Sequence, residues 1–158
     1  MAVHFSAHAL RRGMWLWPPF LGAGISVIEL DKDFTRLTSR LRSSRLSRNN
    51  QGTQFGGSIL SLTDPFFAIM LLHHLGKDHY VWDRAVEAEF IAPGRTALTA
   101  HFAVTPELVA EIREAAATGE KVLRWLEVDV TDAAGDVVAR VRKQLYIRQR
   151  KHLRANAT

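Results

Sequence analysis

The sequence predicts an α+β fold in which one long apolar helix is wrapped by about six antiparallel strands, with two further helices at its flanks. Two observations support this prediction. Residues 60–75 form a strongly apolar stretch, too short to span a bilayer and better explained as a helix buried in the core of a soluble domain. The segments on either side alternate apolar and polar residues, as half-buried strands do, and polar turns separate them.

The composition is that of a single domain, which we expect to span residues 1–158. Its 47% of hydrophobic residues can form one good core. The sequence has no cysteine, which excludes disulfides, thiolate zinc sites and a cysteine nucleophile. Lys and Arg number 21 against 16 Asp and Glu, giving a net charge of +5. This charge suits an anionic partner, but CoA, nucleic acid and a membrane surface all qualify.

The first elements are a short helix and a hairpin. Residues 3–17 predict an amphipathic helix that ends at Pro18-Pro19. The apolar run that follows Arg11-Arg12 resembles an export signal, but the two prolines interrupt it and no convincing cleavage site follows. We therefore expect a cytoplasmic protein without a membrane span. Alternation then predicts two strands, at about 24–30 and 35–42.

The remaining elements follow the apolar stretch. A helix is predicted over about 106–117, with Thr105 as N-cap and Pro106 at its first position. Glu127 and Asp129 are expected to pair with arginines across the last hairpin, and arginines left unpaired are a candidate CoA phosphate site. Four strands are predicted, at about 80–91, 96–104, 121–131 and 137–149. In the last strand one side carries Arg140, Arg142, Arg148 and Arg150, and the other carries Val141, Leu145 and Ile147.

Asp64 requires an explanation because it lies within the apolar stretch. A buried carboxylate loses its hydration at a cost of several kcal/mol unless a partner compensates it. Two interpretations stay open. In the first, Asp64 is the N-cap of a helix whose first residue is Pro65. In the second, the helix starts near Gly57 and spans about 57–75, and Pro65 bends it so that Asp64 faces a partner or a cleft.

A family resemblance enters at these residues. The pattern NxxGTxFGGS, the apolar helix with Asp64, and the later YVWD and FIAPGR resemble the hotdog-fold acyl-CoA thioesterase superfamily. Within it they resemble the phenylacetyl-CoA-thioesterase-like branch and an uncharacterised subfamily of that branch. The resemblance covers roughly residues 22–150. Its ordered set of Asn50, Gly56-Gly57, Asp64 and Pro93 is more specific than the glycine pair alone. It implies a hotdog fold, in which a curved antiparallel sheet wraps the long helix, and it favours the second interpretation of Asp64.

The resemblance also implies roles for these residues. The backbone N–H of Gly57 would polarise a thioester carbonyl, Asp64 would act as general base or nucleophile, and Asn50 would help position the water or the carbonyl. Thr53 offers an additional hydroxyl nearby in the sequence. Gly57 and Asp64 are two helical turns apart, about 10 Å, so one chain cannot bring both to one carbonyl. Asp64 would therefore come from the partner subunit of a homodimer or a dimer of dimers.

Two positions depart from the family pattern. Asp83 stands where some relatives carry serine, and a second acid there would repel Asp64. Phe55 stands where many relatives carry histidine, and it cannot donate a hydrogen bond to the carbonyl. It could instead line an acyl pocket, although core packing is the more common role of such aromatic side chains. The further candidates for substrate contact are Gly56, Phe67, Trp82 and Arg95.

Three classes of function remain. The first is hydrolysis of an acyl-CoA or other acyl thioester, without a cofactor or a metal. The second is a non-catalytic protein of the same fold that binds acyl thioesters or fatty acyl groups, suggested by Phe55 and Asp83. The third is nucleic-acid binding, suggested by the positive charge, but no basic motif interleaved with aromatic residues supports it, and we expect no nucleic-acid partner.

Overall fold

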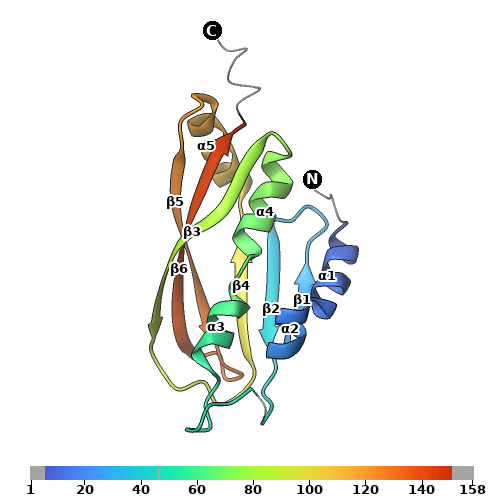
Figure 1. Ribbon diagram of the computed structural model, residues 1–158, viewed down its shortest axis with the longest axis vertical. Coiled ribbons are helices and arrows are strands. Elements are labelled where there is room, and N and C mark those ends of the chain that lie inside the picture. Colours follow the sequence, from blue (N-terminus) through green and yellow to red (C-terminus); the bar gives the residue numbers. More distant parts are fainter. Residues whose placement is uncertain (1–5, 46, 151–158) are drawn as a thin grey trace.

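The computed structural model describes residues 6–45 and 47–150, and in them a six-stranded antiparallel sheet holds a central helical segment against one face (Figure 1). The sheet order is β1-β2-β4-β5-β6-β3. Among the described residues, two pairs join β4 to β5, whereas β6 pairs along its length with both β5 and β3. The strands are β1 (Ile25–Leu30), β2 (Arg36–Leu41), β3 (His79–Phe90), β4 (Leu98–Ala103), β5 (Val122–Thr131) and β6 (Val137–Gln149). This arrangement confirms the predicted α+β fold.

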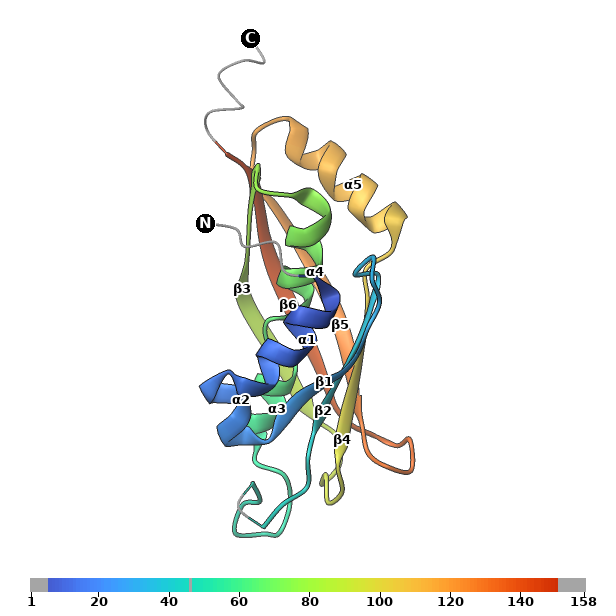
Figure 2. The same ribbon diagram turned by 90° about the vertical axis from the view of Figure 1, so that its right-hand side faces the viewer.

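Within the described residues, three helices flank the sheet, one more than the sequence predicts. α1 (Ala7–Leu16) packs on β1, and residues 3–5 of the predicted helix lie outside the described part of the chain. Pro18 and Pro19, taken as a helix end, also begin the short helix α2 (Pro18–Ala23). Proline is well suited to a first helical turn, because the N–H groups there have no partner within the helix. Figure 2 shows α1 and α2 together on one side of the molecule.

The remaining flanking helix follows its predicted boundaries. α5 (Pro106–Ala117) begins after Thr105, whose hydroxyl accepts a hydrogen bond from the backbone N–H of Leu108 at 3.2 Å. This is the N-cap that the sequence predicts. α5 turns Val109, Ile112 and Ala116 into the core. It packs against α4, β5 and β6 at the far end of the sheet from α3 (Figure 2).

The central helix is interrupted rather than bent. α3 (Gly56–Leu62) ends at Thr63, and α4 (Phe66–Leu75) begins after Pro65 without a side-chain cap, so Asp64 is not an N-cap. Proline has no N–H and its ring clashes with the preceding turn, which explains an interruption here. The buried Ser39 of β2 donates a hydrogen bond to the Leu62 carbonyl at 2.8 Å, satisfying one carbonyl at the break.

The core lies between the central helix and the concave face of the sheet. Its largest fully buried side chains include Phe66 and Met70 of α4 and Phe102 of β4. The segment Gly56–Leu75 is long and apolar enough for a membrane span by length and composition, but 56% of its most apolar window is buried within the fold. It is therefore better described as a core helix.

Candidate active site

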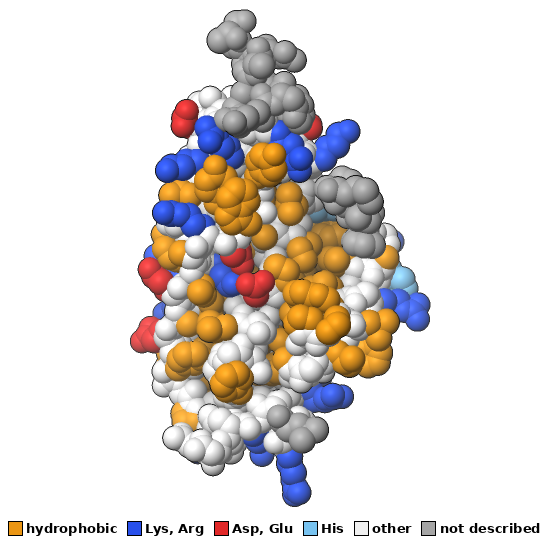
Figure 3. Space-filling view, viewed as in Figure 1, with side chains coloured by type: hydrophobic (Ala, Val, Ile, Leu, Met, Phe, Trp, Pro, Cys, Tyr) orange, Lys and Arg blue, Asp and Glu red, His pale blue; other side chains and the backbone are white. Residues whose placement is uncertain are grey.

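The break in the central helix brings Asp64 to the surface. Its side chain is 52% exposed, in a hollow of about 210 Å³ between the α1–α2 corner and β3. Leu60, Ser61 and Lys143 belong to the same hollow, with Trp17 and Val86 on its two sides. Figure 3 shows this face of the molecule, where a small group of acidic and basic side chains is set among hydrophobic ones.

Lys143 is the partner of Asp64. Side chains alternate along β6, so Lys143 points to the same face as the fully buried Val141 and Leu145, and it is itself only 3% exposed. Its Nζ donates to Asp64 Oδ2 at 3.0 Å and to Asp83 Oδ2 at 2.9 Å. Lys143 is not among the site residues that the sequence predicted. A lysine at an apolar position of the strand alternation was the available signal.

Asp83 completes the cluster. A shift in the β3–β6 register between Asp83 and Ala85 marks a β-bulge, a feature that redirects side chains near functional sites. Asp83 is 19% exposed. Burial raises its pKa, the Lys143 ammonium opposes that rise, and the Asp64 charge adds to it. The expected repulsion between the two acids is therefore offset by a shared ammonium that the sequence did not suggest.

The start of α3 lies between two aromatic rings. A Cβ added to Gly57 would come within 2.4 Å of the Phe55 ring, and one added to Gly56 within 3.2 Å of the Phe90 ring. The first hydrogen bonds of α3 are donated by Ser58 and Ile59 to the Phe55 carbonyl. The N–H groups of both glycines thus precede the bonding pattern of the helix, as those of the first helical turn do. Such groups can hold an anion or an oxyanion.

The loop before α3 is organised by Asn49 rather than by Asn50. The Asn49 amide donates to the Thr53 hydroxyl at 2.8 Å, and its oxygen accepts from the backbone N–H of Thr53 at 3.1 Å. Asn50 is exposed. Asn49 is also the residue that begins the NxxG pattern. The same loop is fixed to the β3–β4 turn because Gln54 donates to the Thr96 carbonyl at 3.0 Å.

Within one chain, some of the predicted site residues line two separate hollows and others line neither. A second hollow, of about 340 Å³, is lined by Thr53, Gly56 and the turn after β3, and it shares no lining residue with the Asp64 hollow. Phe67 is 3% exposed and packs on Phe102, so it belongs to the core. The other two candidates are exposed and lie elsewhere: Trp82 stacks on Tyr146, and the Arg95 carbonyl accepts a hydrogen bond from Arg48.

The arginines of β6 are mostly engaged. Arg140 pairs with Asp129 at 2.8 Å and with Glu127 at 3.3 Å, which confirms the predicted pairing across the hairpin. Arg142 pairs with Glu87 of β3 at 2.7 Å. These contacts leave less positive charge available for phosphates than the sequence suggested.

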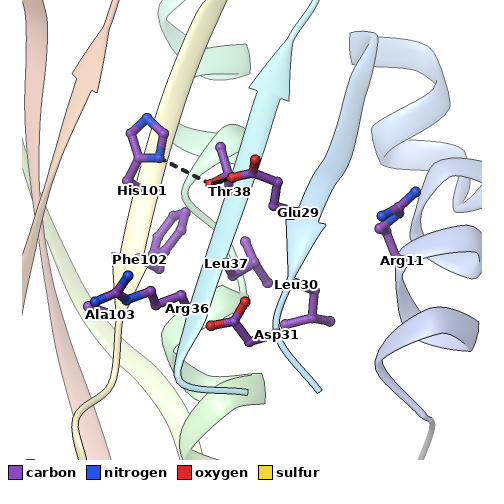
Figure 4. Close-up of a pocket in the computed structure, with 10 residues that line it drawn as sticks. All are labelled: Arg11, Glu29, Leu30, Asp31, Arg36, Leu37, Thr38, His101, Phe102 and Ala103. Atoms are coloured by element: carbon purple, nitrogen blue, oxygen red, sulfur yellow. Dashed lines mark hydrogen bonds between the residues drawn. The ribbon is translucent and has the colours of Figure 1, made fainter. Parts of the chain in front are cut away.

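A larger hollow, of about 700 Å³, lies over β1, β2 and β4 (Figure 4). In it, Thr38 donates to Glu29 at 2.8 Å and lies 3.1 Å from Nδ1 of His101. Thr38 and His101 pair across two strands, on the side opposite to the core residues Leu37 and Phe102. This hollow contains none of the predicted site residues.

β3 is the open edge of the sheet. β1, at the other edge, is packed against α1. Phe90 pairs with Ala139 across the β3–β6 ladder, yet Ala139 is fully buried while Phe90 is 55% exposed. The central helix therefore leaves part of the inner face of β3 uncovered. A long exposed edge strand with apolar side chains on its inner face, such as Val86 and Phe90, can pair with another chain.

Comparisons with known proteins agree with this architecture. The protein PA5026 of Pseudomonas aeruginosa, described as a probable thioesterase of unknown function, is 16% identical, with a TM-score of 0.83 over 95% of this chain and 100% of its own. The thioesterase HI1161 of Haemophilus influenzae is 12% identical, with a TM-score of 0.67 over 99% and 97%. The E. coli PaaI protein, from the phenylacetic acid degradation operon, is 17% identical, with a TM-score of 0.59 over 89% of each chain.

These likenesses show that the chain has the hotdog fold of thioesterase-like proteins. No curated protein sequence matches it. A family model, described as "Domain of unknown function (DUF4442)", matches residues 6–147, which is most of the chain. The chain therefore belongs to the DUF4442 family.

Proposed function

We propose that this protein hydrolyses acyl thioesters, such as acyl-CoA, with Asp64 as the catalytic carboxylate. The observation that carries the proposal is the environment of Asp64: a half-exposed carboxylate in an apolar hollow, paired with a buried lysine. Burying a carboxylate in an apolar core costs free energy. Here a break in the central helix exposes Asp64 and Lys143 orients it, and both features favour a chemical role for this carboxylate. The thioesterase-like relatives of the same fold support the same reaction.

In the proposed mechanism, the backbone N–H of Gly57 donates to the thioester oxygen. Asp64 of the partner subunit removes a proton from water, whose oxygen attacks the carbonyl carbon, and the C–S bond then breaks to release thiol and acid. Direct attack by the Asp64 carboxylate, through an acyl anhydride that water hydrolyses, is the alternative route. Thr53 and the exposed Asn50 lie on the loop before Gly57, from which they can help position the reactants.

The role of the partner subunit is supported by two features. The Asp64 hollow and the Gly56 hollow are separate within one chain, and the edge strand β3, with Val86 on one hollow and Phe90 on the other, is exposed. A homodimer formed along β3 would cover this edge and could bring the two hollows together. We propose that the active unit is such a dimer or a dimer of dimers.

Lys143 and Asp83 are proposed as positioning residues. The ammonium of Lys143 fixes one oxygen of Asp64 and leaves the other available for water. Asp83 anchors the ammonium from the opposite side. Because Asp83 stands where some relatives carry serine, this lysine-bridged pair of acids would replace the arrangement implied by the resemblance.

A second candidate function is binding of acyl thioesters without hydrolysis. The Phe55 ring lies against Gly57 and supplies no hydrogen-bond donor for a carbonyl oxygen. If the ring blocks the approach to the Gly57 N–H, the fold would retain a ligand without activating it.

Thiol release from short, medium, long and aromatic acyl-CoAs, including phenylacetyl-CoA, separates the two functions and tests the proposed branch. Wild type should hydrolyse acyl-CoAs of at least one of these four classes. Asp64→Asn should lose at least 100-fold in kcat, within the range of general-base effects, while keeping its oligomeric state. Asp136→Asn, in the exposed β5–β6 turn, is the matched control and should retain activity. Full turnover in Asp64→Asn would remove Asp64 from the mechanism. Saturable binding without turnover by wild type would establish the second function.

A further inference from the structure

An apolar groove lies beside the proposed catalytic hollow. It has a volume of about 370 Å³ and runs between one face of α1 and Pro65 at the break of the central helix. Its lining is Ala9, Leu10, Gly13, Met14, Trp17 and Pro65. None of these side chains carries a charge, and the arginines of α1 lie elsewhere: Arg11 lines the hollow of Figure 4, and Arg12 contacts His8.

Gly13 lines this groove, and no packing contact within the described chain requires a glycine there. It lies inside α1, where glycine costs about 1 kcal/mol relative to alanine. A Cβ added at Gly13 would meet no atom within 4 Å, and its φ is not in the left-handed region. Neither a close neighbour nor a special backbone conformation requires glycine here. The missing side chain instead leaves the groove open.

The groove and the Asp64 hollow are adjacent, and one lining residue is common to both. Trp17 lines both of them, and Pro65 of the groove follows Asp64 of the hollow in the chain. The Trp17 ring is held in place by Phe20 at a centroid distance of 5.0 Å, and Phe20 packs in turn on Phe66 of α4. A ligand whose reacting carbon lies at Asp64 can therefore extend past Trp17 along α1 without leaving apolar surface.

We propose that this groove holds the acyl chain of the substrate, and that the substrate class is acyl thioesters with an unbranched chain of medium length. The proposal rests on the proposed function for the placement of the thioester at Asp64. From Ala9 to Trp17 the groove follows about 12 Å of helix, which accommodates roughly nine methylenes of an extended chain. A CoA moiety, with its phosphates, is excluded from it because the lining offers no cation.

The dependence of binding affinity on the length of the acyl chain tests this proposal quantitatively. A fully buried methylene tightens binding by about fourfold, and a groove open on one side should give about twofold to threefold for each methylene. Affinity should therefore rise steadily from a butyl to about a decyl chain and then level off. A side chain at Gly13 that fills the groove should remove the dependence of affinity on chain length and leave only the affinity that the CoA moiety provides.

The test is calorimetric titration of the full protein with non-hydrolysable S-alkyl-CoA thioethers from butyl to dodecyl. Gly13→Leu is the groove-filling variant. Gly22→Leu is its control, because Gly22 is also helical and exposed, would likewise meet no atom within 4 Å of an added Cβ, and lines none of the hollows described above. Thermal unfolding and sedimentation velocity of both variants verify fold and assembly.

The expected result is at least a 50-fold gain in affinity from butyl to decyl in wild type and Gly22→Leu, and less than a 5-fold gain in Gly13→Leu. An equal gain in all three proteins would overturn the proposal. It would also be overturned if Gly13→Leu altered only self-association or binding to phospholipid vesicles, since the groove would then hold a second copy or a membrane. Thiol release from the matching acyl-CoAs is measured in parallel. Groove-dependent binding without hydrolysis by wild type would reject the proposed function and retain the acyl groove.

Discussion

Replacing Lys143 with methionine removes the ammonium between two carboxylates and keeps the volume of the side chain nearly constant. Lys143 is 3% exposed, and one oxygen of Asp83 is already buried without a hydrogen-bond partner in the described structure. Breaking a fully buried ion pair costs about 3–5 kcal/mol because a charge is left uncompensated. Asp64 is half exposed and can be solvated, so we expect Lys143→Met to lower the free energy of unfolding by the lower end of this range, about 3 kcal/mol.

Urea unfolding at pH 7 measures this loss directly. With an m-value of about 2 kcal/mol per molar, the midpoint should fall by about 1.5 M. Arg142→Met is the matched control, because Arg142 directly precedes Lys143 in β6 and its ion pair with Glu87 is slightly shorter, at 2.7 Å, but lies where the side chains are 47% and 56% exposed. An exposed pair contributes about 0–1 kcal/mol, so its midpoint should move by less than 0.5 M.

The two variants also differ in their expected pH dependence. As the pH falls, Asp83 becomes protonated and no longer needs a counter-charge, so the stability lost in Lys143→Met should shrink. The reasoning is refuted if Lys143→Met and Arg142→Met shift the midpoint equally, or if the loss in Lys143→Met does not depend on pH. Either result would mean that the buried cluster is solvated like a surface pair.

Two further predictions concern Asp83 and the β3 edge. Burial raises the pKa of Asp83 above its ordinary value, so the folded state binds more protons than the unfolded state between the ordinary and the raised pKa, and stability falls as the pH rises through this window. Asp83→Asn should flatten that fall in urea midpoints measured across pH, and an unchanged slope would contradict the assignment. Ala88→Lys places a charge on the exposed inner face of β3 and should leave a monomer of 17.8 kDa with lost turnover. Sedimentation velocity tests this, and a wild-type sedimentation coefficient in the variant would exclude β3 as the interface.

Most of the fold could be predicted because its signals are local. Helix α5 has its N-cap and its proline adjacent in sequence at Thr105 and Pro106, and these two residues fix its start. The strands follow period-two alternation, which their own residues encode. Helix α2 escaped prediction because the same two prolines can end one helix and begin the next, and only the packing of Phe20 into the core favours the second outcome.

The candidate site was predicted only in part because its decisive contact is not local. Asp64 is an evident anomaly within an apolar stretch, but its partner Lys143 is 79 residues away along the chain. Lys143 shares the face of Val141 and Leu145, and pairing it with Asp64 requires knowing that β6 lies under the helix break. In the loop, the sequence predicted a role for Asn50, whereas Asn49 makes the hydrogen bonds to Thr53. Two consecutive asparagines offer the same side chain, so the sequence alone does not distinguish them.

The strand order has a consequence for how the chain folds as it is synthesised. β1, β2 and β4 can pair with one another early, but in the described part of the chain only two residue pairs link β4 to β5, and β3 pairs with no strand except β6. β3 must therefore wait, with its apolar side chains unpaired, until some sixty further residues have left the ribosome, at least about three seconds at ordinary elongation rates. During that interval the nascent chain exposes the same strand that we propose as the dimer edge. Neighbouring ribosomes on one message could then join two such strands before either sheet is complete.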